Sequence, residues 1–404
     1  MGVMDGIRVL EVATWTYVPM AGGVLAEWGA DVIKVEHPEG GDPQRGLVSS
    51  GLVPGGGKVA FMVEHPNRGK RSIGLDLTVD AGRETLLKLA AGSDVFLTNL
   101  LPGAMARLKI DVDDIRAVNP SIIYARGTAN GPVGPESHRG GYDNCTFWAR
   151  GGSADTIKTP SMAYPPSQPG GAYGDTMGGL TIAGGIAAAL LQRERTGVAA
   201  TIDCSLLAMG MWATSFTIAG AAAFDRDRLG TADRVDAPNP LVCAYRTADD
   251  RFLSLVMLQS DRYWPELMEA VGRSDLVDDE RFADAGARAR NNHACVAVLD
   301  EIFATRTLAE WKDVLADIKG IWSPVQTPGE ILEDPQVKAN GYIAEVAGAD
   351  GGSFKLVTTP VQFDGQPAQP RRAPGHGEHT DEILGELGMD MDAILDLKIA
   401  GAVL

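Results

Sequence analysis

The chain has 404 residues, of which 45% are hydrophobic and 22% charged, and its formal net charge is -17. This composition predicts a folded protein with a large core, long enough for two or three domains, and carries no signature of disorder. The acidic total argues against binding to nucleic acid or to an anionic membrane, but it leaves room for a small anionic ligand that local basic groups could bind.

The cysteines and the N-terminus favour a cytoplasmic protein. The four cysteines are far apart, with no CxxC or Cys/His ligand spacing, which predicts reduced thiols and no metal site: Cys145, Cys204, Cys243 and Cys295. The first residues show no basic segment followed by an apolar run, so we expect no signal peptide. The most apolar run, residues 178–191, is expected to be too short and too rich in glycine for a membrane span.

The N-terminal part alternates strand-like and helix-like patterns. Strands are predicted at residues 7–12, 30–35, 72–77, 94–98 and 121–126, and helices at 21–28, 80–91 and 111–118. Such alternation predicts an α/β fold with an open, doubly wound, mainly parallel sheet.

The pattern changes in the second half. Residues 127–169 are rich in Gly, Pro and Ser and are expected to form loops, before a long helix at 175–195, a strand at 199–203 and a helix at 205–221. After a polar stretch, strands are expected around 248–250, with helices near 262–271, 288–304 and 308–318. The last segment predicts strands near 346 and 354–357 and a helix from 380. We therefore predict a smaller α+β domain at residues 226–328.

The turn after the first predicted strand is a candidate ligand site, because ligands gather at the carboxyl ends of parallel strands. It contains Thr14, Trp15, Thr16 and Tyr17. It lacks the GxGxxG fingerprint, so a nicotinamide cofactor is poorly supported. A helix that begins near Pro19 would still offer free N–H groups to an anion. A plain turn between a strand and a helix explains the pattern equally well.

A basic loop stands out in this acidic chain. Arg68, Lys70 and Arg71 lie close together, with Lys34, Arg45 and Arg107 as possible neighbours. Guanidinium and ammonium groups in a loop suit phosphates. A solvated loop without a ligand is the alternative.

Asp175 lies between glycines where the long helix is predicted to begin. The helix dipole would favour its ionised form and keep it available as a nucleophile. Nearby glycines let a bulky ligand approach, and backbone N–H groups can face a developing oxyanion. On pattern alone, an ordinary N-cap is the stronger interpretation. The many small residues that follow predict close packing, either within the chain or across a dimer.

Taken together, these motifs resemble the class III CoA-transferase family nearly end to end. The matching segments are GADVIKVEHPEGGDPQRG (29–46), NRGKRSIGLDL (67–77), TNLLPGAMARL (98–108), RGGYDN (139–144), GDTMGGLTIAGGIAAALLQRERTG (174–197) and PGHGEHTDEILGELG (374–388). Each motif is weak alone, and their order along the chain is specific for the family, though not for a substrate.

The resemblance implies a fold, an assembly and a set of site residues. It implies a Rossmann-like large domain built from residues 1–225 and 329–404, a small domain at 226–328 between them, and an interlocked homodimer. Coenzyme A and acyl-CoA are implied as substrates, with a carboxylic acid as second substrate and no permanently bound cofactor. Asp175 takes the place of the catalytic aspartate. CoA-contacting positions are implied at Thr14, Trp15, Thr16, Tyr17, His37, Leu75, Asn99, Arg107, Arg139 and Tyr142, with Arg68, Lys70 and Arg71 as phosphate partners.

Two departures from the family pattern narrow the chemistry. The formyl-CoA transferase branch has His and Gln where Thr14 and Thr16 stand here, and its glycine-rich loop is replaced by residues 256–260, so oxalate and formate are not expected as substrates. The racemase branch has a His-Asp pair where this chain has Tyr142 and Asp143, and Glu where it has Gln259. Tyrosine is a poor base at neutral pH and Gln transfers no proton, so racemisation is disfavoured.

We therefore expect Asp175 to carry first the acyl group and then CoA, with N–H groups around Gly178 and Gly179 stabilising the oxyanion. Three alternatives stay open: an acyl-CoA racemase or isomerase, a non-catalytic acyl-CoA-binding protein, and a nucleotide-dependent oxidoreductase. Five aromatic residues could line an acyl pocket or simply fill the core: Trp15, Tyr17, Tyr142, Phe147 and Trp148.

Overall fold

The computed structural model describes residues 2–47, 50–51 and 59–404, and the chain divides into two compact units. Unit 1 comprises Met1–Thr156, Pro166–Asp227 and Pro335–Leu404, and unit 2 comprises Ile157–Pro165 and Arg228–Asp334. The sequence placed the boundaries at 225/226 and 328/329, and it assigned no part of the loop before the long helix to the smaller unit.

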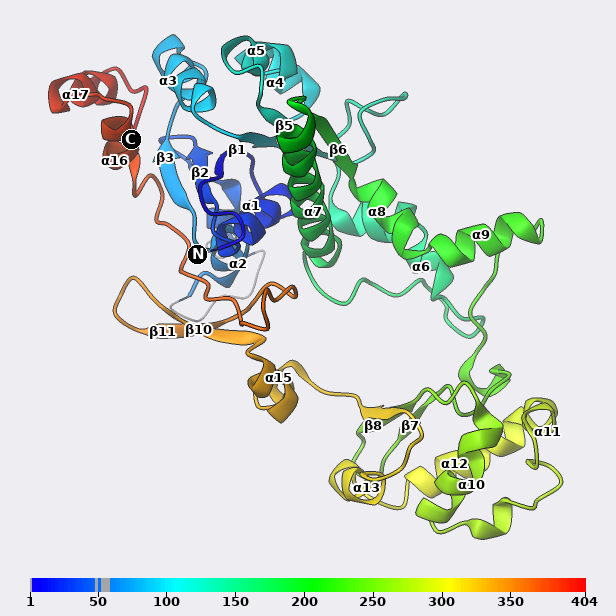
Figure 1. Cartoon of the computed structure of the whole chain (residues 1–404). Coiled ribbons are helices and arrows are strands. Elements are labelled where there is room, and N and C mark those ends of the chain that lie inside the picture. The colour runs from blue at the N-terminus through cyan, green and yellow to red at the C-terminus, as the bar shows by residue number, and fades with distance from the viewer. Residues whose placement is uncertain (1, 48–49, 52–58) are drawn as a thin grey trace. The chain divides into compact units, whose positions relative to one another are not determined.

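Unit 1 is built on a six-stranded sheet in the order β3-β2-β1-β4-β5-β6 (Figure 1). The strands are β1 (Arg8–Val12), β2 (Asp31–Glu36), β3 (Arg71–Gly74), β4 (Val95–Thr98), β5 (Ile123–Thr128) and β6 (Thr201–Ser205). All neighbouring strands in it are parallel, with Leu10 opposite both Ile33 and Phe96. This strand order is that of the doubly wound dinucleotide-binding fold. The predicted Rossmann-like parallel sheet is confirmed.

Successive side chains of these strands point to opposite faces of the sheet, and different helices cover the two faces. Val9 and its neighbours pack against α1 (Tyr17–Glu27) and α7 (Tyr173–Thr196). Leu10 and its neighbours face α3 (Asp80–Ala91), α4 (Pro102–Leu108), α5 (Val112–Val118), α16 (Thr380–Glu386) and α17 (Met391–Ile399). The C-terminal helices therefore share a core with the N-terminal strands, and both ends of the chain belong to this unit (Figure 1).

Several elements of unit 1 differ from those predicted. The helix expected at 205–221 is two helices, α8 (Leu206–Ala213) and α9 (Ser215–Ala223), which are bent by 69°. The Thr214 hydroxyl lies at the bend and donates to Gly151 O over 2.9 Å. Short elements that the sequence did not reveal are η1 (Pro43–Gly46), α2 (Phe61–Asn67), α4, the π-helix η2 (Asn144–Arg150), α6 (Ser153–Thr156) and α15 (Pro335–Asn340). The hairpin β10 (Ile343–Ala347) and β11 (Ser353–Val357) forms the second sheet.

Helix α7 is longer than its apolar run suggested. Its 24 residues are long and apolar enough to cross a membrane by length and composition, as are α8 and α9 taken together, so the expectation that this run is too short was wrong. One side of α7 is buried in the core of unit 1, through Gly178, Gly179, Ile182, Ala183 and Ile186. Because this side packs against the sheet and α1, we interpret α7 as a core helix.

Unit 2 is a small α+β unit with an antiparallel sheet in the order β7-β8-β9. Its strands are β7 (Ala244–Arg246), β8 (Phe252–Leu255) and β9 (Trp322–Pro324), and its helical segments are η3 (Arg234–Asp236), α10 (Ser260–Ala270), η4 (Ser274–Leu276), α11 (Ala285–Arg290), α12 (Asn292–Phe303), α13 (Leu308–Val314) and α14 (Pro328–Ile331). The helix predicted at 288–304 is interrupted at Asn291, whose side-chain amide donates to Arg281 O and Ala287 O. All four cysteines of the chain are free.

Candidate active site

A pocket lies at the point in the sheet of unit 1 where the chain changes direction. From β1 the chain builds β2 and β3 on one side, and it then returns to build β4 on the other side of β1. Ligands of open α/β sheets bind at such a switch point, outside the carboxyl ends of the strands. The cavity has a volume of about 90 Å³. It is lined by Trp15, Tyr17, Asn99, Leu100, Leu101, Pro102, Gly127, Thr128, Ala129, Ser137, Arg139, Gly140, Gly141, Tyr142, Asp175 and Leu206.

The turn after β1 is held in an unusual backbone conformation. Trp15 has a φ of 68°, in the left-handed region that costs a non-glycine residue roughly 1–2 kcal/mol. Its N–H donates to Asp42 Oδ1 over 3.1 Å. The Asn99 side chain holds the backbone of Thr14 with two hydrogen bonds. Thr14 N donates to Asn99 Oδ1 over 3.1 Å, and Asn99 Nδ2 donates to Thr14 O over 2.6 Å. These contacts fix the turn so that Trp15 and Tyr17 line the pocket.

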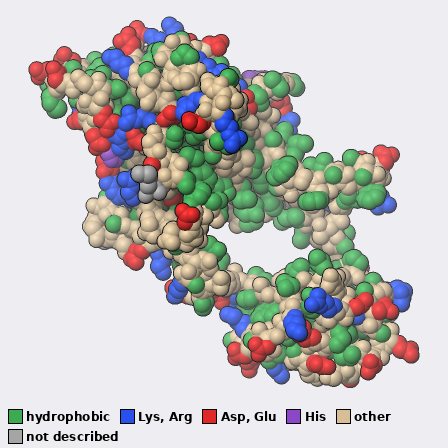
Figure 2. Space-filling view, in the orientation of Figure 1, with side chains coloured by type: hydrophobic (Ala, Val, Ile, Leu, Met, Phe, Trp, Pro, Cys, Tyr) green, Lys and Arg blue, Asp and Glu red, His purple; other side chains and the backbone are tan. Residues whose placement is uncertain are grey.

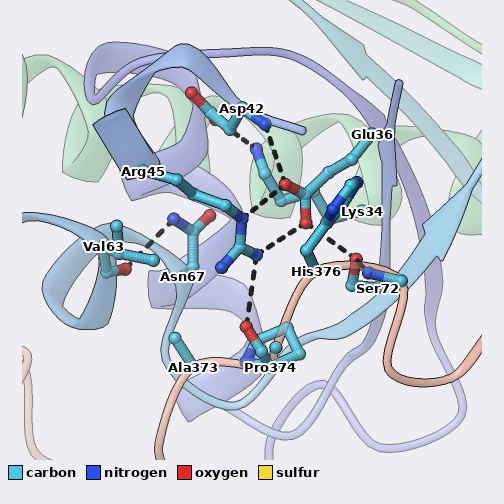
Figure 3. Close-up of polar contacts among 12 residues, drawn as sticks. Lys34, Glu36, Asp42, Arg45, Val63, Asn67, Ser72, Ala373, Pro374 and His376 are labelled. Carbon is cyan, nitrogen blue, oxygen red and sulfur yellow. Dashed lines mark hydrogen bonds and ion pairs between the residues drawn. The ribbon is translucent and has the colours of Figure 1, made fainter. Parts of the chain in front are cut away.

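A network of charged side chains holds Asp42, the acceptor of the Trp15 N–H, and Figure 3 shows the part of it that includes Lys34, Glu36 and Arg45. Lys34 is fully buried, and its Nζ contacts Asp42 Oδ2 at 2.9 Å and donates to Glu11 Oε1 over 3.1 Å. Glu36 accepts hydrogen bonds from Arg45 and from the Ser72 hydroxyl, each at 2.7 Å. Burial opposes ionisation of Glu36, but the hydrogen bonds from Arg45, the charges of Lys34 and Arg45 and the hydrogen bond from Ser72 together lower the pKa of Glu36 to about 2.

The basic loop is part of this buried framework, which corrects the prediction that it binds phosphates. Lys70 is buried and donates to Glu11 Oε2 over 2.7 Å and to Pro19 O over 2.8 Å. Arg68 is also buried and forms an ion pair with Glu27 at 2.6 Å. Arg71 is shared by three carboxylates: Asp31 at 2.7 Å, Glu386 at 2.6 Å and Glu382 at 3.0 Å. A ligand phosphate could reach Arg68 or Lys70 only by breaking the packing around them.

The other predicted CoA contacts are distributed unevenly. Trp15, Tyr17, Asn99, Arg139 and Tyr142 line the pocket with Asp175, and the ring centroids of Trp15 and Tyr142 are 5.8 Å apart in an edge-to-face contact. The remaining ones do not line it: Thr14, Thr16, His37, Leu75 and Arg107. Leu75 is buried, whereas His37 and Arg107 are exposed. The Arg107 guanidinium forms no ion pair with any residue that the structure describes.

The aromatic residues divide between pocket and core. Phe147 and Trp148 are buried in the core of unit 1, so the idea that they line an acyl pocket was wrong for both. The sequence did not single out the pocket residues at the end of β5, although the ends of parallel strands are where such residues are expected.

Asp175 is the third residue of α7 and not its N-cap. The N-cap is Ala172, with a φ of 63°, and the N–H of Gly174 is satisfied instead by Asp143 Oδ2 over 3.1 Å. Asp143 is the N-cap of η2 and also accepts from Gln168 Nε2 over 3.0 Å. The carboxylate of Asp175 makes no hydrogen bond or ion pair with any residue that the structure describes. It is half-buried at the wall of the pocket.

The ionisation of Asp175 differs from the expectation based on the helix dipole. Burial, and then the negative charge of Asp143, raise the pKa of Asp175 to about 7. The dipole was expected to favour the charged form. Burial and the neighbouring carboxylate prevail, so Asp175 changes charge near neutral pH, which is the range in which a carboxyl group can serve as nucleophile or base.

Gly178 and Gly179 have a different role from the one predicted. They lie beyond the first turn of α7, so their N–H groups bond within the helix and are not available to an oxyanion. A Cβ on Gly178 would clash with the Tyr17 ring, and one on Gly179 would clash with Met20. These two glycines let α1 approach α7 closely. The residues described contain no group of three or more His, Cys, Asp or Glu that could hold a metal ion.

The fold and the site together define a Rossmann-type protein with an unpaired carboxylate in a pocket at the switch point of its sheet. The chain matches CoA-transferase family III over residues 4–380. It is 30% identical to cinnamoyl-CoA:phenyllactate CoA-transferase of Clostridium sporogenes, over 98% of this chain and 96% of that protein. It is 32% identical to succinate–glutarate CoA-transferase of Agrobacterium fabrum, over 95% of each. A CaiB/BaiF family protein of Brucella suis has the same fold, with a TM-score of 0.84 and 30% identity over 96% of this chain and 99% of that one. This chain belongs to CoA-transferase family III.

Proposed function

We propose that the enzyme moves CoA from an acyl-CoA donor to a carboxylic acid acceptor through an aspartyl-CoA thioester on Asp175. The observation that carries this proposal is the free carboxylate of Asp175 at the pocket. In a chain whose other buried acids near the turn are paired, a half-buried acid without a partner has no structural role. Its pKa of about 7 means that a large fraction is ionised at neutral pH.

The reaction balances without a redox cofactor. A carboxylate oxygen of Asp175 attacks the thioester carbonyl, forms a mixed anhydride and expels the CoA thiolate. The thiolate then attacks the aspartyl carbonyl, which gives the aspartyl-CoA thioester and releases the donor acid. The acceptor carboxylate attacks this thioester and expels the thiolate again. Attack of the thiolate on the acceptor carbonyl yields the new acyl-CoA and restores Asp175.

The lining of the pocket favours a larger or aromatic acyl group over formate or oxalate. Trp15, Tyr17 and Tyr142 supply rings to its wall. The name of the Clostridium sporogenes relative contains two aromatic acids, which is consistent with such a substrate. The exposed guanidinium groups of Arg107 and Arg139 suit the phosphates of CoA, although Arg139 also pairs with Glu136 at 2.7 Å.

We further propose that the enzyme works as an interlocked homodimer in the cytoplasm. Helices α8 and α9 of unit 1 expose large apolar side chains, including Trp212 at 76% and Phe216 at 95% exposure. Figure 2 shows hydrophobic side chains gathered at the surface around α7 and α8. Exposed apolar patches of this kind mark interaction surfaces, and a second copy of the chain is the partner that we propose.

Trapping of the covalent intermediate tests the proposal directly. The protein is incubated with a panel of acyl-CoA donors, quenched with hydroxylamine and digested with trypsin. The tryptic peptide 159–193 contains Asp175 as its only acidic side chain, so a hydroxamate on a side chain of this peptide identifies the site without further sequencing. We expect a label with the true donor in the native protein and none in Asp175→Asn, whose transfer activity should fall by at least about 10³-fold.

The outcome also separates the alternatives. Absence of a label from every donor, or wild-type transfer by Asp175→Asn, would refute the proposal. A racemase would instead incorporate solvent deuterium at the α-carbon of the acyl-CoA without a label on the peptide. A non-catalytic binding protein would bind acyl-CoA and show neither signal.

A further inference from the structure

Tyr17 is clamped between two glycines next to the catalytic aspartate. Its ring lies between Gly127 at the end of β5 and Gly178 on α7, because a Cβ on Gly127 would lie 2.9 Å from Tyr17 Cε1 and one on Gly178 would overlap with Cε2. The residue is only 6% exposed. The clamp leaves the ring little freedom, so the position of its hydroxyl is fixed by the backbone of two neighbouring elements.

The hydroxyl of Tyr17 is buried and has no hydrogen-bond partner among the described residues. The thiol of Cys204 lies close to this hydroxyl, and its charge and side-chain contact contribute, after burial, to the raised pKa of Tyr17. A thiol is only a weak acceptor, and it does not satisfy the hydroxyl as a carbonyl oxygen would. Leaving a buried donor unpaired costs about 1–3 kcal/mol. The other large buried tyrosines avoid this cost, since Tyr124 donates to Ile110 O over 2.8 Å and Tyr245 donates to Pro240 O over 2.6 Å.

Asp175 and Tyr17 face the same cavity. Gly178, which touches the Tyr17 ring, follows Asp175 by three residues, so the two positions lie on one face of α7. Both Tyr17 and Asp175 line the pocket. Burial first, and the charges of Cys204 and Asp175 after it, raise the pKa of Tyr17, so its hydroxyl keeps its proton and remains a donor at neutral pH.

We propose that the Tyr17 hydroxyl is the oxyanion donor of this enzyme: it donates a hydrogen bond to the acyl carbonyl oxygen as Asp175 attacks the thioester. The proton stays on Tyr17, and negative charge that develops on the carbonyl oxygen is stabilised until the C–S bond breaks. The acyl carbonyl oxygen thereby supplies the acceptor that the Tyr17 hydroxyl lacks in the protein alone. This inference rests on the proposed function and gives Tyr17 the task that Gly178 and Gly179 cannot perform.

The variant Tyr17→Phe tests this role, because it removes the hydroxyl and keeps the clamped ring. Loss of one oxyanion donor typically lowers kcat by about 10²–10³-fold, and we expect a fall in that range with KM unchanged within about threefold. The thermal midpoint should stay the same or rise, because an unpaired buried group is removed. Tyr124→Phe is the matched control: it removes a buried hydroxyl that is bonded far from the pocket, so it should lower the midpoint and leave kcat unchanged.

A kcat of Tyr17→Phe within about threefold of wild type would overturn the inference, since even a weak oxyanion donor contributes more than that. The rate at which the donor labels Asp175 is measured in the same samples. If the label forms as fast in Tyr17→Phe as in wild type, the role of Tyr17 is refuted and the proposed function is not. No label in wild type refutes the proposed function and the inference with it. A slow label in Tyr17→Phe, with native stability and normal binding of acyl-CoA, supports both.

Discussion

Two sets of polar groups near the turn after β1 differ in how they are paired. In the buried charge network, Lys34, Lys70 and Glu11 are each fully enclosed and paired with opposite charges or carbonyl groups. Toward the pocket, the buried Tyr17 hydroxyl and the half-buried Asp175 carboxylate have no hydrogen-bond partner among the described residues. Because an unpaired buried group costs stability, its persistence indicates a function, whereas complete pairing indicates a structural role.

The largest change in the free energy of unfolding should come from removing a charge of the buried network. Glu11→Ala leaves Lys34 and Lys70 buried with less negative charge around them, and removing one partner of a buried ion pair costs about 3–5 kcal/mol. We expect urea unfolding to show a loss of that size in the free energy of unfolding. Glu39→Ala, at an exposed position, should change it by less than about 0.5 kcal/mol. A loss below about 1 kcal/mol for Glu11→Ala would show that the network is not structural.

The second prediction concerns Asp175: its replacement should raise the free energy of unfolding, whereas Glu11→Ala should lower it. The raised pKa of Asp175, about 7 against 3.8 in the unfolded chain, means that between these values the folded protein holds a proton that the unfolded chain has lost. Its contribution to stability therefore falls as the pH rises through this window. Asp175→Asn lacks this penalty, so its free energy of unfolding should exceed that of wild type by roughly 1–3 kcal/mol at pH 8, with the excess shrinking toward pH 4.

Asp113→Asn is the matched control for this gain. Asp113 is an exposed aspartate in the first turn of α5, where the helix dipole stabilises its charge. Its replacement should be neutral or destabilise by up to about 1 kcal/mol at neutral pH. An equal gain in both variants would show that the stability of Asp175→Asn does not arise from burial of the carboxylate.

The smallest effect tests how Asp143 acts on Asp175. Because the charge of Asp143 is the second cause of the raised pKa, Asp143→Asn should lower the pKa of Asp175. The rate of labelling of Asp175, which rises with pH as the carboxylate ionises, should then reach its midpoint at a pH lower by up to about one unit. A midpoint that stays in place or moves up would exclude an electrostatic role for Asp143. The hydrogen bond to Gly174 is partly retained by the amide oxygen.

Local patterns in the sequence revealed much of the scaffold and little of the electrostatics. The alternation of strands and helices before residue 127 was sufficient to predict the parallel sheet, because each strand is buried and bounded by clear turns. The resemblance to the family drew attention to Asp175 when pattern alone favoured a cap. The breaks at Thr214 and Asn291 were missed because side-chain hydrogen bonds to distant backbone interrupt helices that local propensity would continue.

Partners that are distant in sequence explain the remaining errors. Arg71 pairs with Glu386, which is 315 positions away, so no local pattern shows that the basic loop is already neutralised. The pKa of Asp175 is raised by burial and then by the charge of Asp143, and both exist only in the folded chain, where Asp143 meets the start of α7. The unpaired hydroxyl of Tyr17 is likewise a property of its surroundings and leaves no mark in the sequence.

The glycine clamp around Tyr17 also constrains how the family could diversify at this site. A side chain at Gly178 would collide with the Tyr17 ring, whereas one at Gly127 would collide first with Val18 and then with Tyr17. Replacement of Gly178 therefore requires a smaller residue at position 17, and replacement of Gly127 requires changes at both positions 17 and 18. Lineages that keep a large ring at position 17 should keep Gly178, in a comparison of many homologues.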